Sequence, residues 1–164
     1  MSVSLSSIEK IMTLLAEAPS QIAATTADLK SVQLHTSLGH EEWSANDVLA
    51  HLRSCADVWG NCIVTIIAQD NPTIRAINPR TWIKQTNYLE QKFQSSLHAF
   101  AIQRTDLLNA LEPLTHADWL RSAIVTGAGK PLERTVLFYA QWMASHERPH
   151  LKQIKSIANT MRLQ

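Results

Sequence analysis

Near the end of the chain, a long series of mostly apolar residues has the spacing of one face of an α-helix. From residue 132 to residue 161, each step between its members is three or four residues, which is the spacing along one face of an α-helix. The members are Leu132, Val136, Tyr139, Met143, His146, His150, Ile154, Ile157 and Met161. Pro131 suits the first turn, where its missing N–H has no partner to lose. The pattern predicts a helix from residue 131 to about 160 with two histidines on its buried face.

A second stripe with the same spacing runs through residues 45–69. Ser44 followed by Asp47 is a variant of the capping box and predicts that this helix begins at Ala45. The predicted buried face consists of Val48, His51, Cys55, Val58, Cys62 and Ile66. A third inward histidine, His51, is therefore expected on a different helix.

Two further amphipathic segments complete the pattern. Residues 5–30 have helical spacing on both sides of Pro19, which leaves either one kinked helix or two short ones. Another helix is predicted from Leu89 to Leu111, closed by Pro113. The sequence thus predicts an all-α fold: a four-helix bundle with long connections between helices 2 and 3 and between helices 3 and 4, forming a single domain over residues 1–164.

Composition excludes several classes of function. The chain has 164 residues, of which 45% are hydrophobic, and a net charge of +1, which fits one globular domain. Lysines and arginines are scattered, so we expect neither a nucleic-acid partner nor a basic membrane-binding patch. No apolar run approaches membrane-spanning length, and the first residues lack a signal-peptide pattern. Cys55 and Cys62 are two helical turns apart, about 10 Å, which is too far for a disulfide, so a cytoplasmic location is expected.

The three inward histidines predict a metal site. Burying an imidazole without a partner costs about 1–3 kcal/mol for each unsatisfied group, whereas one divalent cation can satisfy His51, His146 and His150 together. Three ligands from two helices leave a coordination position open for water or substrate. Zinc, nickel and iron all suit such a site. Asp47 either orients an imidazole or only caps its helix, and Cys55 is either a soft ligand or a small buried hydrophobe.

Residues 146–150 also match the H-E-x-x-H pattern of zinc proteases, with Glu147 as the general base. The longer protease pattern requires glycine at Gln153 and histidine at Ser156. Pro149 also removes a helical hydrogen bond inside the motif. A protease is therefore only a remote alternative.

Three other features receive no function from the sequence. The GAGK segment of residues 127–130 lacks the first glycine and the final Ser or Thr of a phosphate-binding loop. Arg75 and Arg80 lie in the connection of residues 70–88 and either contact a substrate or are merely solvated. Arg104 falls near the apolar face of its helix and either extends to the surface or reaches a polar cavity.

The segments EWSANDVLAHL (residues 42–52) and HERPHLKQI (residues 146–154) together resemble the DinB-like, YfiT-related superfamily. This resemblance extends over nearly the whole chain. It implies a four-helix bundle, often dimeric, in which His51, His146 and His150 bind a divalent metal.

The resemblance also implies a range of activities. Members of known activity include metal-dependent transferases and isomerases that use low-molecular-weight thiols, and some members are labelled hydrolases. We therefore expect a metal-dependent transferase that activates a small thiol, or water, as nucleophile. Its expected partners are a small-molecule thiol, an electrophile and a second copy of the chain. The competing interpretation is a binding or stress-response module without turnover.

Overall fold

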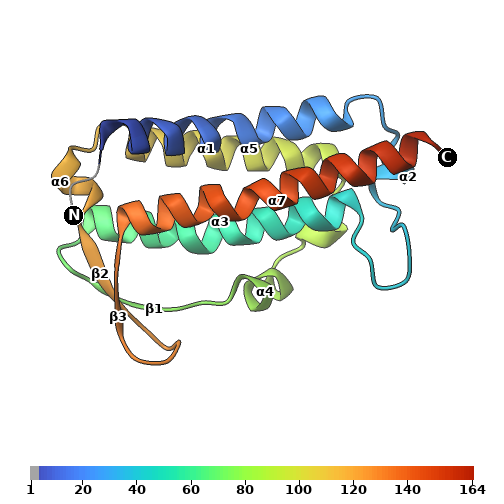
Figure 1. Cartoon of the computed structure of the whole chain (residues 1–164). Coiled ribbons are helices and arrows are strands. Elements are labelled where there is room, and N and C mark those ends of the chain that lie inside the picture. The colour runs from blue at the N-terminus through green and yellow to red at the C-terminus, as the bar shows by residue number, and fades with distance from the viewer. Residues whose placement is uncertain (1–3) are drawn as a thin grey trace.

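The computed structural model describes residues 4–164, in which four long helices pack side by side (Figure 1). They are α1 (Leu5–Thr26), α3 (Ala45–Ala68), α5 (Phe93–Leu111) and α7 (Val136–Arg162). Helices α7 and α5 each contact both α1 and α3, so the order around the bundle is α1, α7, α3, α5. The predicted all-α four-helix bundle is confirmed, with long connections on both sides of α5. In the described residues, no helix is long and apolar enough to cross a membrane.

Short elements occupy the connections. The helical turns are α2 (Ser31–Leu34), α4 (Pro79–Trp82), η1 (Ile83–Gln85), η2 (Tyr88–Glu90) and α6 (His116–Trp119). The strands are β1 (Thr73–Arg75), β2 (Ser122–Thr126) and β3 (Leu132–Thr135), in the order β1-β2-β3. Strand β1 pairs with β2 in parallel, and β2 pairs with β3 antiparallel. The small sheet thereby joins the two long connections to each other (Figure 1).

The start predicted for the last helix was wrong. Residues 132–135 form β3, whose Leu132 pairs with Val125 of β2, and α7 begins only at Val136. Gly127 and Gly129 have φ angles of +87° and +83°, a left-handed conformation that glycine adopts without strain. The GAGK segment is therefore the turn of a hairpin. The Thr135 hydroxyl accepts a hydrogen bond from the Phe138 N–H at 3.0 Å and caps α7.

The other helix boundaries follow local chemistry. Helix α1 is one helix that continues through Pro19, which settles the alternative that the sequence left open. Ser44 and Asp47 form a reciprocal capping box at the start of α3, so Asp47 has the capping role. Helix α5 begins at Phe93 rather than Leu89, because residues 88–90 form a separate turn. His35 Nε2 accepts the Phe93 N–H at 3.2 Å.

A buried ion pair crosses the centre of the bundle. Arg104 of α5 is 2% exposed and Glu147 of α7 is 3% exposed, and two nitrogens of the guanidinium contact both oxygens of the carboxylate. One of these nitrogens also donates to the Leu15 carbonyl oxygen of α1 at 2.7 Å. Arg104 therefore connects three of the four long helices from inside the core and does not extend to the surface.

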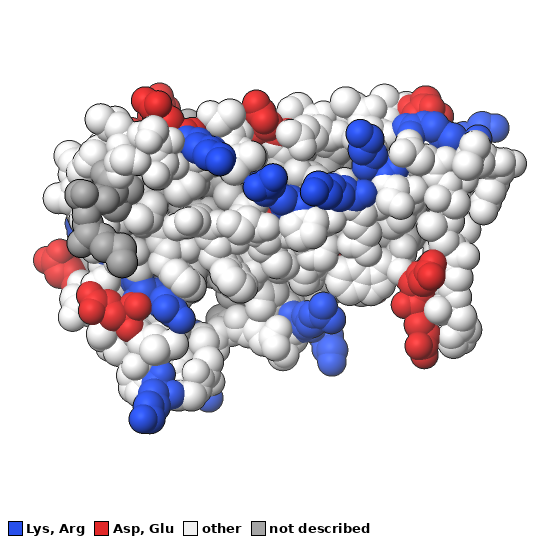
Figure 2. Space-filling model, in the orientation of Figure 1, with Lys and Arg blue, Asp and Glu red and all other residues white. Residues whose placement is uncertain are grey.

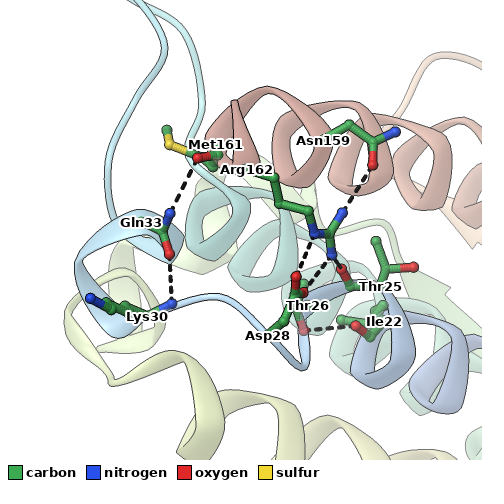
Figure 3. Close-up of polar contacts among 9 residues, drawn as sticks. All are labelled: Ile22, Thr25, Thr26, Asp28, Lys30, Gln33, Asn159, Met161 and Arg162. Carbon is green, nitrogen blue, oxygen red and sulfur yellow. Dashed lines mark hydrogen bonds and ion pairs between the residues drawn. The ribbon is translucent and has the colours of Figure 1, made fainter. Parts of the chain in front are cut away.

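Hydrogen bonds hold the C-terminal end of α7 against the C-terminal end of α1 (Figure 3). Arg162 donates from Nε to Asp28 at 2.8 Å and also contacts the Thr25 carbonyl oxygen. Gln33 donates to the Met161 carbonyl oxygen at 3.2 Å. These contacts fix the last turn of the helix that carries two of the three inward histidines.

Candidate metal centre

The histidines predicted on two different helices meet between α3 and α7. His51, on the second turn of α3, is 7% exposed, and its Nε2 lies 3.3 Å from Nε2 of His146 on α7. Helices α3 and α7 are in extensive contact along their length, which brings these two positions together although they are far apart in the sequence. Two imidazole nitrogens from different helices thus lie in direct contact.

Cys55 is the third donor of this cluster. Its Sγ lies 3.6 Å from His51 Nε2, and the donor atoms of His51, Cys55 and His146 all lie within 4.8 Å of one another. Burial raises the pKa of the Cys55 thiol to about 12, with a further contribution from the Glu147 carboxylate. The spacing of four residues from His51 was the sequence signal for this contact.

The His150 ring adjoins the cluster. Its centroid lies 4.9 Å from the His51 ring and 4.7 Å from the His146 ring. Nδ1 of His150 lies 3.0 Å from Oε1 of Gln153. Because an amide oxygen only accepts, Nδ1 carries the proton and Nε2 keeps its lone pair for a ligand. Sequence reasoning missed Gln153, although its position three residues after His150 places it on the same helix face.

Aromatic rings form the walls around these donors. The Trp59 ring meets His146 edge-on at 4.9 Å between centroids. Trp43 lies 5.2 Å from His51 and 6.3 Å from His150. Within residues 4–164, Nδ1 of His146 is buried without a hydrogen-bond partner. His51 is thus buried among these rings, whereas His146 and His150 are half-buried.

This environment keeps two of the imidazoles neutral. Burial chiefly, together with smaller contributions from neighbouring histidines and the Arg80 charge, lowers the pKa of His51 and of His146 to about 4. At neutral pH, both rings therefore have a free lone pair, which is the form that binds metal ions.

We expect the metal-free protein to lose stability as the pH falls from about 6.5 to about 4. The unfolded chain protonates both rings near pH 6.5, whereas the folded protein does so only near pH 4, so protons favour unfolding between these values. The stability is fully present above this window and falls by roughly 1.4 kcal/mol per pH unit for each ring that titrates in this way.

Urea denaturation with a chelator present, at several pH values across that window, measures this loss. A double variant, His51→Gln with His146→Gln, should show a flatter profile. A wild-type profile as flat as that of the double variant contradicts the argument.

The two nearby carboxylates, Glu147 and Asp47, already have other hydrogen-bond partners. Glu147 is held by Arg104 in the core, on a different face of α7 from His146 and His150, and Asp47 accepts the Ser44 N–H at 2.9 Å. In the part of the chain that the structure describes, the donor cluster contains no carboxylate. Glu147 is therefore not placed to act as the base of a zinc protease.

The donor separations fit a metal ion. With a metal–nitrogen bond of about 2.0–2.1 Å and a metal–sulfur bond of about 2.3 Å, tetrahedral angles place two nitrogens about 3.3 Å apart and a nitrogen and sulfur about 3.6 Å apart. The observed His51–His146 and His51–Cys55 separations are 3.3 and 3.6 Å. Imidazole and thiol donors together suit zinc, nickel and iron better than magnesium or calcium.

A solved structure has a similar fold. YfiT from Bacillus subtilis, described as a probable metal-dependent hydrolase with an unusual four-helix bundle topology, superposes with a TM-score of 0.82 and 18% sequence identity. The match covers 98% of this chain and 90% of YfiT. No curated protein sequence matches the chain.

The family relationship rests on a sequence model as well as on the fold. The model of the DinB superfamily matches residues 14–154, a range that runs from α1 to α7 and contains all four donors described above. This range covers most of the chain. The protein belongs to the DinB superfamily.

Proposed function

We propose that this protein binds a divalent metal ion through His51 and His146, with His150 or Cys55 as a further ligand, and uses it to activate a small thiol or water as nucleophile. The observation that carries the proposal is the 3.3 Å approach of two neutral imidazole nitrogens, one from α3 and one from α7. The DinB family and the fold shared with YfiT support it.

The chain's own residues prepare the site for such chemistry. A bound divalent cation lowers the pKa of a coordinated thiol or water, so that a nucleophile is available near neutral pH. Gln153 holds the Nδ1 proton of His150 and so directs the lone pair to Nε2. Trp43 and Trp59 limit the access of bulk water to the imidazoles.

A thiol fits this site better than water does. Hydrolysis also needs proton transfers, to which a general base contributes, and the carboxylates of Asp47 and Glu147 are occupied by the helix cap and by Arg104. A thiol needs chiefly to be ionised, because the thiolate is itself a strong nucleophile. Transfer of a small thiol to an electrophile is therefore the reaction that we propose.

Cys55 supports a second candidate, a binding module without turnover. If Cys55 and all three histidines bind the ion together, four protein ligands complete a tetrahedral set, which is the pattern of structural rather than catalytic zinc sites. The position of the Cys55 thiol within the donor cluster is the observation behind this alternative.

Turnover of a generic thiol and electrophile separates the two candidates. We expect metal-loaded protein, given 2-mercaptoethanol and an alkylating electrophile near pH 7, to form thioether faster than chelator-treated protein, with a rate that saturates in thiol. In a catalytic site, Cys55→Ser should retain this activity. Saturable thiol binding without product formation favours the binding module instead.

A further inference from the structure

An open groove of about 610 Å³ begins at His150 and reaches the surface. Its walls come from α4, from the second half of α7 and from the loop between α2 and α3. The residues that matter here are Trp43, Arg80, His150 and Gln153, with Glu41 and Glu42 at the loop. A small molecule in this groove would contact His150 at one end and both kinds of charge along the walls.

Arg80 supplies the positive charge. Its guanidinium carbon lies 5.6 Å from the centre of the Trp43 ring, and within residues 4–164 it forms no ion pair. Arg80 and His150 line the same groove, which places the guanidinium beside the donor cluster. The guanidinium is thus available to a ligand.

The backbone that carries Arg80 is held in place. The Ser54 hydroxyl of α3 donates to the Pro79 carbonyl oxygen at 2.6 Å, and Asn78 Oδ1 accepts the Arg80 N–H at 2.9 Å. Trp82 Nε1 donates to the Asp57 carboxylate of α3 at 3.0 Å. Helix α4 is therefore docked on α3, and it presents Arg80 on the side of the donor cluster.

An arginine whose backbone is held beside the proposed metal site has an electrostatic consequence. Two cations close together repel each other, and an anion bound between them removes the repulsion and is attracted by both. Arginine matches a carboxylate especially well, because two of its N–H groups can donate in parallel. Resting on the proposed function, we infer that Arg80 recognises a carboxylate on the small-molecule substrate of the metal site.

The opposite wall limits the charge that this substrate can carry. Figure 2 shows basic side chains over α4 and acidic side chains over the loop between α2 and α3, with uncharged surface between them. Glu41 and Glu42 lie on that loop and line the groove. They repel a second negative charge and attract an ammonium group. The preferred ligand class is a small carboxylate, with a zwitterion favoured over a dianion.

Small thiols with and without a carboxylate test this inference on cobalt-loaded protein, with the sulfur-to-cobalt charge-transfer absorption as the measure of binding. We expect 3-mercaptopropionate, which has a carboxylate, to bind at least about fivefold more tightly than uncharged 2-mercaptoethanol. Arg80→Gln should abolish this preference, so that the two thiols bind with similar affinity. Arg80→Lys should retain part of it.

Lys84→Gln is the matched control, because it removes an exposed positive charge from the same segment at a residue that does not line the groove. This variant should behave like the wild type. A wild-type protein without the preference, or an Arg80→Gln variant that keeps it, overturns the inference and leaves the metal site intact. Failure to bind cobalt at all contradicts the proposed function itself, so the two failures are distinguishable.

Discussion

Arg104→Met should lower the free energy of unfolding by about 3–5 kcal/mol. The variant leaves the Glu147 carboxylate inside the core without its cation and leaves the Leu15 carbonyl oxygen without its donor. Burial raises the pKa of Glu147, and the nearby Arg104 charge opposes this rise. Without Arg104, the charged form of the carboxylate is therefore strongly disfavoured. Urea denaturation near pH 7 measures the effect.

Two further variants show whether the ion pair is the cause. Arg148→Met removes a neighbouring exposed charge on α7 and should change stability by less than about 0.5 kcal/mol. The double variant Arg104→Met with Glu147→Met replaces both buried charges by apolar groups and should recover much of the loss. If Arg104→Met alone is as stable as Arg148→Met, the central ion pair does not hold the bundle together as described.

Removing either convergent imidazole should lower metal affinity by about a hundredfold or more. His51→Ala and His146→Ala each delete one of two nitrogens that lie 3.3 Å apart, and the remaining donors cannot replace it from the same helix position. Competition with a chromophoric chelator measures the affinity of each variant for zinc.

His98→Ala is the control, because His98 is exposed on α5 and should leave affinity unchanged. Cys55→Ser and His150→Ala, measured in the same way, identify the further ligand. Near-wild-type affinity in both His51→Ala and His146→Ala contradicts the proposed site.

The helices and the inward histidines were predictable because they depend on spacing alone. Every member of the predicted face of α3 is buried, including His51 and Cys55. Periodicity also explains the main error: Leu132 stands four residues before Val136 and so extends the stripe, although it belongs to β3 and is 44% exposed. Short strands are invisible to a helical pattern when their residues happen to continue it.

Side-chain partners were less predictable because they depend on three-dimensional packing. The partner of Arg104 lies 43 positions away, and Glu147 stands outside the apolar stripe of α7. Similarly, spacing predicted that His51 and His146 face inward, but it did not predict that their Nε2 atoms are in contact. Nor did it predict that the charge of Arg80 influences the pKa of His51. Such contacts follow from how the helices and the long connection pack together.

Anomalous diffraction from crystals grown with zinc, recorded on both sides of the zinc absorption edge, tests the central claim most directly. We predict one strong peak between α3 and α7, within about 2.0–2.2 Å of Nε2 of both His51 and His146. A zinc ion bound elsewhere, or one that contacts neither nitrogen, contradicts the claim.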